Sequence, residues 1–192
     1  MIFQPTLNIA QEAWLAEKGG TQFLFHARGK SAGIWRVQVD NHFLAAKAEH
    51  ALSTRPRMVE REAENLRAAN AKGIGPRLRA HDPSSRILLM EWVDGIPLGE
   101  WLDRDAPEWE WHPVLRDLFT QAHQLDTMGL DHGQLGGKLH NILIRPDGRP
   151  CILDFEKAVW KERPHNVSKL HHVLLSGKTQ YSLRVRERLG IV

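Results

Sequence analysis

The stretch that most constrains the fold is ILIRPDGRPCILDF, residues 142–155. Two short apolar runs, residues 142–144 and 151–153, lie on either side of the turn-forming sequence Pro-Asp-Gly. Aliphatic runs around a Gly-containing turn are typical of a β-hairpin. The chain is therefore expected to pair these two runs as antiparallel strands, so that the residues just outside them meet at the open end of the hairpin.

Both residues at that open end carry oxygen atoms. If Asp147 and Gly148 form the tip, equal steps outward bring Asn141 level with Asp154, within one residue. An amide oxygen and a carboxylate suit a hard cation such as Mg²⁺, which takes few protein ligands. The same two residues are equally suited to capping a turn and ending a strand, so the pair alone leaves both interpretations open.

Length and composition fit a small chain with one core or two small lobes that share a cleft. The chain has 192 residues, 42% of them hydrophobic. Its net charge of +3 comes from Lys and Arg scattered among Glu and Asp, which permits acidic or nucleic-acid partners without indicating them. The single cysteine, Cys151, excludes an internal disulfide framework, and its apolar neighbours predict a buried thiol.

The sequence gives no sign of membrane targeting. Its first residues lack a basic stretch followed by a long apolar core, and no run approaches the roughly 18 apolar residues of a spanning helix. We therefore expect a cytoplasmic protein that does not contact the membrane.

Hydrophobic periodicity predicts a leading helix, a sheet with one helix inserted, and then helices around the hairpin. In the leading helix, residues 8–18, Ile9, Trp14 and Leu15 are expected near one face. This order predicts an α+β chain in two lobes with a hinge near residues 93–98. Strands are expected on both sides of the turn 29–33, in a third run ending near residue 47, and over 77–81 and 86–92; the other helices are expected over 57–72, 98–102, 113–128 and 166–175.

Glu62 is an unusual residue for its position. It lies on the apolar arc of the helix predicted over 57–72, where a carboxylate needs a partner. Lys47, at the end of an apolar strand, is the obvious candidate, and such a pair can hold a lysine toward the phosphates of a nucleotide. The alternative is a surface lysine and a partly buried Glu62 paired with an arginine.

The turn from Gly29 to Gly33 contains small residues between two expected strands. Backbone amides in such a turn can approach phosphates closely. The turn lacks the Gly-x-x-x-x-Gly-Lys-Ser/Thr pattern and no helix follows it directly, which disfavours a Walker-type nucleotide fold.

Taken in chain order, these features resemble the protein kinase superfamily over roughly residues 22–160. The similarity is closest to the minimal kinases: the RIO family, the small kinase of the KEOPS complex, and uncharacterised prokaryotic predicted Ser/Thr protein kinases with an Asp-Phe-Glu motif, here residues 154–156. The resemblance implies a two-lobed protein kinase-like fold of the α+β class. Residues 1–93 would form the N-lobe, and residues 94–192 a truncated, mainly helical C-lobe.

The resemblance also implies ATP and Mg²⁺ as cofactors and assigns a role to each site residue. The assignments are a glycine loop at Gly29 and Gly33, an ion pair of Lys47 with Glu62, a gatekeeper at Met90, adenine contacts from the backbone of Glu91 and Val93, and metal ligands at Asn141 and Asp154.

The chain departs from the kinase pattern at the catalytic loop. His132-Gly133-Gln134 aligns with His-Gly-Asp or His-Arg-Asp, so Gln134 replaces the catalytic aspartate, and an amide cannot take a proton at neutral pH. Gln134 and Asn141 lie seven residues apart instead of the usual five, which suggests a longer loop accommodated by two glycines at 136 and 137. Asp131 or a rearranged loop is a candidate for compensation.

Four functions follow from these features. The leading one is an atypical ATP-dependent Ser/Thr protein kinase, with its own chain as one acceptor. The alternative is a pseudokinase that recognises a partner protein, with or without ATP, and Gln134 favours it. A small-molecule phosphotransferase ranks lower because the short C-lobe leaves little room for an acceptor pocket. An RNA-associated module rests only on the basic charge and on analogy with the RIO and KEOPS kinases.

Overall fold

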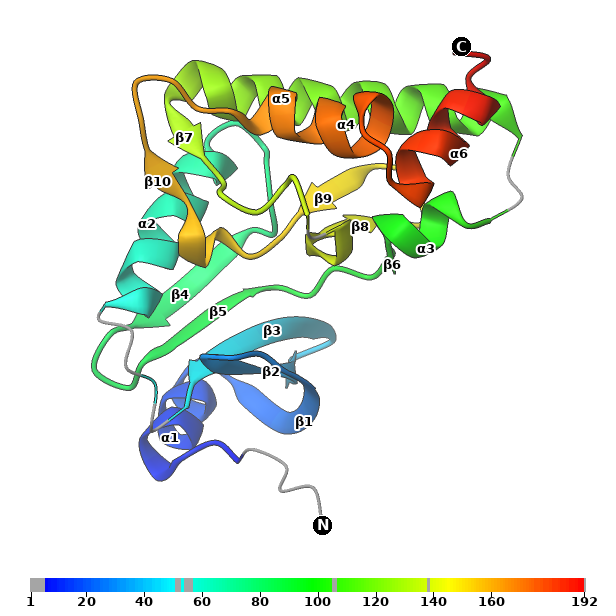
Figure 1. Cartoon of the computed structure of the whole chain (residues 1–192). Coiled ribbons are helices and arrows are strands. Elements are labelled where there is room, and N and C mark those ends of the chain that lie inside the picture. The colour runs from blue at the N-terminus through cyan, green and yellow to red at the C-terminus, as the bar shows by residue number, and fades with distance from the viewer. Residues whose placement is uncertain (1–5, 51–52, 54–56, 105–106, 138, 192) are drawn as a thin grey trace. The chain divides into compact units, whose positions relative to one another are not determined.

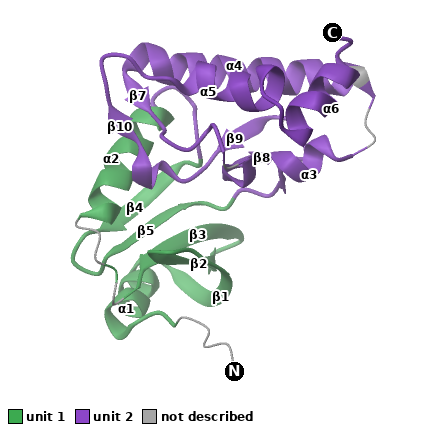
Figure 2. Cartoon of the chain, in the orientation of Figure 1, with its two compact units in different colours: residues 1–70, 76–92 green, residues 71–75, 93–192 purple. Residues whose placement is uncertain are grey.

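The chain folds into two compact units, which Figure 2 colours separately. The computed structural model describes residues 6–50, 53, 57–104, 107–137 and 139–191. Unit 1 comprises residues 1–70 and 76–92, and unit 2 comprises residues 71–75 and 93–192.

Unit 1 is an antiparallel sheet with two helices (Figure 1). The strands lie in the order β1-β2-β3-β5-β4, and every neighbouring pair is antiparallel. The strands predicted around residues 29–33 and over 77–92 are thereby confirmed. The elements are α1 (Ile9–Glu17), β1 (Gly20–Arg28), β2 (Ala32–Val39), β3 (His42–Glu49), α2 (Met58–Asn70), β4 (Leu78–Asp82) and β5 (Ile87–Glu91).

The two faces of this sheet pack into separate apolar clusters because successive strand residues point to opposite sides. Ile87 and Leu89 of β5 join Leu15 of α1 in one cluster. Leu88, between them, packs with Met58 of α2 in the other. The alternation in β5 therefore places α1 and α2 against opposite faces of the sheet.

Helix α1 confirms the predicted leading helix but not all of its predicted face. Leu15 is fully buried, whereas Ile9 is 87% exposed. Gln11 is buried instead, and its Nε2 donates to the backbone carbonyls of Glu49 and Ser85. Periodicity alone placed Ile9 near the buried face, but it lies at the first turn, beyond the reach of the sheet.

Glu49 at the end of β3 anchors the start of α2. Its carboxylate accepts a hydrogen bond from Val59 N (3.2 Å) and from Arg86 Nε (2.8 Å). A carboxylate near the N-terminus of a helix satisfies a free backbone N–H and interacts favourably with the helix dipole. Because the Glu49 side chain is almost fully buried, both contacts are needed to compensate its desolvation.

Unit 2 is mainly helical and contains two small sheets, β6-β8-β9 and β10-β7. Helices α4 and α5 pack side by side (Figure 1). The predicted α+β class is confirmed. The elements are β6 (Ile96–Pro97), α3 (Leu98–Leu102), α4 (Glu108–Met128), β7 (Leu130–Asp131), β8 (Ile142–Ile144), β9 (Pro150–Ile152), β10 (Val159–Trp160), α5 (Asn166–His171) and α6 (Gln180–Arg188).

The predicted hairpin is present as β8 and β9. Its register pairs Ile142 with Ile152, and the backbone of Arg145 pairs with that of Arg149 around a three-residue turn. Gly148 adopts a positive φ of 81°, which closes the turn without steric cost. The tip is thus one residue longer than a two-residue turn. As a result, Asn141 lies level with residue 153, one position before Asp154, which is within the expected range of one residue.

Two helical boundaries differ from expectation. Helix α4 begins at Glu108, five residues before Pro113, because the helix-starting proline is Pro107 at the N-cap and the helix tolerates Pro113 in its second turn. The predicted helix 166–175 is α5 followed by a π-helical turn over 172–176. Helix α6 was not predicted from the sequence, although Thr179 marks its start by accepting a hydrogen bond from Ser182 N.

In the described ranges, no helix combines the length and the low polarity that crossing a bilayer requires.

Replacing Glu49 with Ala is expected to destabilise the fold by about 3 kcal/mol, because it frees the α2 N-terminus and leaves Arg86 without its carboxylate partner. Urea unfolding followed by circular dichroism measures the change. Glu64→Ala, at an exposed position of the same helix, is the matched control and is expected to change stability by less than about 0.5 kcal/mol. Equal stability of both variants would contradict the anchoring role.

Candidate functional site

In unit 1, Lys47 and Glu62 form a buried ion pair. Lys47 Nζ lies 2.9 Å from Oε1 and 2.8 Å from Oε2 of Glu62, and the residues are 6% and 1% exposed. Strand β3 supplies the lysine, and the apolar arc of α2 supplies the glutamate. The predicted pairing is confirmed. A bidentate contact at this depth offsets part of the cost of removing both charges from water.

Backbone hydrogen bonds hold the turn between β1 and β2, and His50 Nε2 lies 3.1 Å from Gly29 O. Gly29 N donates to Ala32 O (2.8 Å), and His50 N donates to Ser31 O (3.0 Å). Gly33 has a packing role as well: a Cβ atom there would lie 2.5 Å from the Trp35 ring. The glycine at 33 is therefore required by the core of unit 1, whatever the turn binds.

The residues expected as gatekeeper and adenine contacts lie at the end of β5 and just after it along the chain. Met90, at the partly buried edge of the α2-side cluster, pairs with Ala45 of β3. Glu91 ends β5, where its N–H donates to Arg77 O (2.8 Å) and its carboxylate accepts from Arg77 N (3.1 Å). Val93 is the first residue of the second segment of unit 2.

In unit 2, the amide of Asn141 contacts both Gln134 and Asp154, the other two residues expected at the chemical centre. Asn141 Nδ2 donates to Gln134 Oε1 at 2.7 Å and lies 3.4 Å from Asp154 Oδ2. Gln134 and Asn141 are 6% and 5% exposed. The hairpin places Asn141 and Asp154 together, and the loop before it brings Gln134 to them.

Asp154 adopts a left-handed backbone conformation, with φ 64° and ψ 67°. Non-glycine residues rarely occupy this region, and when they do the strain is often tied to a function. The conformation ends the extended chain after β9, so that the next residue, Phe155, turns into the core, where it is 1% exposed.

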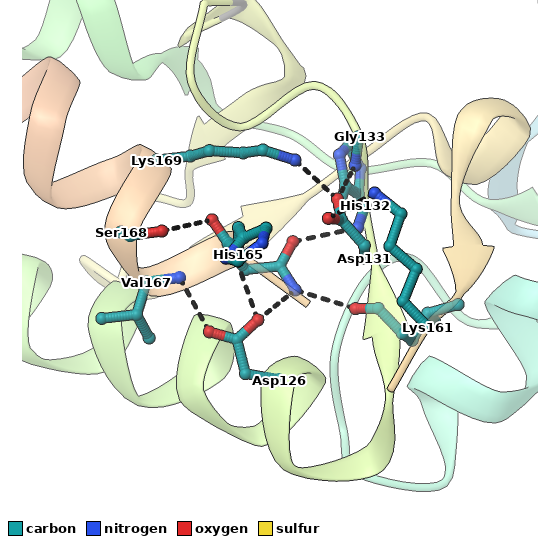
Figure 3. Close-up of polar contacts among 11 residues, drawn as sticks. Asp126, Asp131, His132, Gly133, Lys161, His165, Val167, Ser168 and Lys169 are labelled. Atoms are coloured by element: carbon teal, nitrogen blue, oxygen red, sulfur yellow. Dashed lines mark hydrogen bonds and ion pairs between the residues drawn. The ribbon is translucent and has the colours of Figure 1, made fainter. Parts of the chain in front are cut away.

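Asp131 is held by two lysines. Its carboxylate accepts hydrogen bonds from Lys169 Nζ (2.7 Å), Lys161 Nζ (3.0 Å) and Gly133 N (2.8 Å), as Figure 3 shows. Complete burial by itself raises the pKa of Asp131, but the contacts with Lys169, Lys161 and the Gly133 amide outweigh it and lower the pKa to about 2. A carboxylate this weakly basic is a poor general base, so the two lysines disfavour Asp131 as a substitute for the missing aspartate.

His132 braces the loop through a hydrogen-bond contact and a ring contact. Its Nε2 lies 2.8 Å from Leu153 O, and its ring packs edge-on against Phe155. Burial lowers its pKa, because the surroundings disfavour the charged imidazolium. The neutral ring then ties the loop to the strand that precedes Asp154.

Asn166 fixes the backbone of this loop, and sequence reasoning missed it. Its side chain accepts from His132 N (2.9 Å) and donates to Leu130 O and Asp126 Oδ1 (both 2.8 Å). The Asp126 carboxylate also accepts from Val167 N at the start of α5. The partners are more than thirty residues apart, so the only signal in the sequence was a helix-starting Asn at 166.

The lengthened loop is closed by its glycines, as expected. Gly137 N donates to Gln134 O (3.3 Å). A Cβ atom at Gly136 would lie 3.2 Å from Cβ of Lys169, so the absence of a side chain there lets Lys169 pass along the loop toward Asp131. Gly136 thus accommodates one of the two lysines that neutralise Asp131.

The two units offer different chemistry, each by itself. In unit 1, the ammonium group of Lys47 can attract an anion. In unit 2, amide and carboxylate oxygens can hold a hard cation, the Gln134 amide does not accept a proton at neutral pH, and the Asp131 carboxylate is weakly basic.

Comparison with known proteins gives one family match. Residues 34–172, well over half of the chain, match the model of the RIO domain. The matched range contains Lys47, Glu62, Gln134, Asn141 and Asp154, whereas α1, Gly29, Gly33 and α6 lie outside it. No curated protein matches the chain.

Gly33→Ala is expected to lower the free energy of unfolding by about 1–3 kcal/mol, because the added methyl group forces the Trp35 ring out of its place. Chemical denaturation measures the loss. Gly137→Ala, where a Cβ atom meets nothing within 4 Å, is the control and is expected to be close to neutral. A loss of the same size in both variants would show that the tryptophan contact is not the cause.

The pKa of Asp131 predicts an acid-dependent contribution to stability. Because the folded-state pKa of about 2 lies below the ordinary 3.8, the ion pairs stabilise the fold above pH 4 and lose this effect as the pH falls toward 2. Asp131→Asn is expected to cost about 2 kcal/mol at pH 7 and about half as much at pH 3.

Urea unfolding at the two pH values measures this difference. The exposed Asp147, which pairs with Arg149 in solvent, supplies the control Asp147→Asn, for which no comparable loss is expected. A loss in Asp131→Asn that is the same at both pH values would rule out the ionised carboxylate as its source.

Proposed function

Because the chain belongs to the RIO-type atypical kinase family, we propose that it binds ATP with Mg²⁺ and transfers the γ-phosphate to Ser or Thr hydroxyls of a protein, its own chain included. The chain has a small two-lobed, kinase-like α+β fold. This family is kinase-like, which supports ATP-dependent phosphoryl transfer in general. The metal, the acceptor and the roles of single residues are parts of the proposal.

The observation that carries the proposal is the buried ion pair of Lys47 and Glu62. Burying two charges costs free energy that an apolar pair would not, so a pair at this depth is more easily understood as functional than as stabilising. We assign Lys47 to the phosphates of ATP, with Glu62 fixing the position of its ammonium group. The turn at Gly29 to Gly33 would then cover the phosphates with backbone amides.

The oxygen donors of unit 2 fit Mg²⁺. Asn141 and Asp154 offer an amide and a carboxylate oxygen from neighbouring positions, and Mg²⁺ prefers a few such ligands, with phosphate and water completing its shell. Bound there, Mg²⁺ would neutralise charge on the phosphates. Because Asn141 Nδ2 donates to Gln134 and also lies toward Asp154 Oδ2, the amide oxygen of Asn141 is the atom assigned to the metal.

The adenine is assigned to the strand that ends unit 1. Met90 would lie behind the base as gatekeeper, and the backbone of Glu91 and Val93 would meet its edge. This assignment rests on the family resemblance and on the position of these residues at the end of β5.

The proposed transfer is slow because no side chain of the loop removes the proton of the acceptor. General-base help contributes typically about 10²- to 10⁴-fold, while phosphoryl transfer obtains most of its acceleration from positioning and charge neutralisation. Lys47, Asn141 and Asp154 retain those contributions. The expected enzyme is therefore active at a reduced rate.

A second candidate is a pseudokinase that binds ATP and recognises a partner without turnover. The combination of Gln134 with an Asp131 neutralised by two lysines favours it, since neither position offers a base. ATP binding is common to both candidates, and turnover separates them.

Transfer of labelled γ-phosphate, with Mg²⁺, tests the proposal in the wild-type chain and in Asp154→Asn. Label on the chain or release of ADP is expected in the wild type, and a loss of at least a hundredfold is expected in the variant, because a metal ligand is removed. ATP binding without turnover in the wild type would favour the pseudokinase. Absence of any ATP binding would overturn both candidates.

The role of Lys47 is tested by calorimetric titration with Mg–ATP. Lys47→Met alone leaves Glu62 as an uncompensated buried charge, so Lys47→Met with Glu62→Gln is the informative variant. It is expected to stay folded and to lose about tenfold or more in ATP affinity. Lys72→Met, at an exposed position, is the control. Wild-type affinity in the double variant would exclude the assigned role.

A further inference from the structure

Gln134 presents a buried hydrogen-bond donor that finds no acceptor in the described part of the chain. Its Nε2 is shielded from water and makes no hydrogen bond there. An amide N–H left unpaired in this way costs free energy, and native structures rarely retain one without a reason. The site therefore contains a donor for which a ligand can supply the acceptor.

The orientation of this amide is fixed by its neighbours. Asn141 Nδ2 is 3.4 Å from the Asp154 carboxylate. Because an ionised carboxylate only accepts hydrogen bonds, the Asn141 atom that faces it is the amide nitrogen and not the oxygen. The same nitrogen donates to Gln134 Oε1 at 2.7 Å. Gln134 must then turn its Oε1 to Asn141, and its Nε2 points elsewhere as a donor.

A glutamine at position 134 differs from an aspartate because its side chain can donate a hydrogen bond. Either side chain can accept the hydrogen bond from Asn141, but only the amide has an N–H to donate. A donor beside two oxygen ligands of a metal site matches an oxyanion that the metal also attracts. In a site that holds Mg–ATP, the phosphate oxygens are such groups.

We propose that Gln134 Nε2 donates a hydrogen bond to an oxygen of the γ-phosphate of ATP, so that this position selects ATP over ADP instead of removing a proton. The proposal rests on the proposed function, because it requires ATP at Asn141 and Asp154. Since Nε2 is now shielded, an incoming oxygen has to displace the adjacent loop slightly. Gly136 and Gly137 lie next to Gln134 in that loop, and the space around Gly137 is open.

Two variants separate the donor from the acceptor function of this side chain. Gln134→Glu keeps the shape and the acceptor for Asn141 but loses the N–H, while Gln134→Met has a similar volume and loses both. Affinities for β,γ-imido-ATP and for ADP, each with Mg²⁺, are measured by calorimetry in the three proteins. The ratio of the two affinities reports the γ-phosphate contact without any need for turnover.

Both variants are expected to lose about tenfold or more in affinity for the ATP analogue, and less than about twofold for ADP, because a hydrogen bond to a charged acceptor is removed. An unchanged ratio in both variants would overturn the proposal. A second result would also overturn the proposal: Gln134→Glu keeps the wild-type ratio of the two affinities and Gln134→Met loses it. The acceptor function toward Asn141 would then be enough to explain the preference.

Failure of the γ-phosphate contact can be distinguished from failure of the proposed function. If the wild-type chain binds neither nucleotide, the ATP site itself is refuted, and the inference with it. If the wild type binds both nucleotides equally, only the γ-phosphate contact is refuted. Retained ADP affinity and an unchanged midpoint of thermal unfolding show that each variant is folded.

Discussion

The arrangement of unit 2 depends on the side chain of Asn166, which connects three backbone segments. It holds Leu130 O and His132 N on both sides of Asp131, and it contacts Asp126 of α4. The Asp126 carboxylate in turn receives the first N–H groups of α5. A buried amide with each polar atom paired is rigid, because breaking any contact exposes an unsatisfied group to an apolar interior. The loop that leads to Gln134 therefore starts from a fixed backbone.

Charge compensation in the same region explains why the loop has lost basicity. Two lysines neutralise Asp131, and burial lowers the pKa of His132, which disfavours its charged form. What remains beside the hairpin is a set of neutral amides next to Asp154. Such a set is better suited to orienting oxygen atoms than to moving protons. Both the slow kinase and the ATP-binding pseudokinase agree with this chemistry.

Much of the fold follows from local pattern. The alternation in β2, the short apolar run of β5, the turn at Asp147-Gly148 and the apolar arc of α2 are local signals of strands, a hairpin and a helix. Glu62 was identifiable for the same reason, since a carboxylate on an apolar arc requires a buried cation. The errors lie where pattern is weak. Ile9 is at a helix end, Pro113 imitates a helix start, and α6 is short and strongly charged.

The sequence predicts the order of the elements as far as α5, and it favours the pairing of Lys47 with Glu62 and the proximity of Asn141 to Asp154, because each prediction uses the local pattern of one or two elements. How the remaining polar groups are satisfied depends on the folded chain. The lysines at Asp131, the Asn166 contacts and the unpaired N–H of Gln134 depend on residues brought together from distant parts of the chain. Hydrogen-bond partners across such separations leave no periodic signal, since a single buried amide or carboxylate can be satisfied from many positions in the sequence.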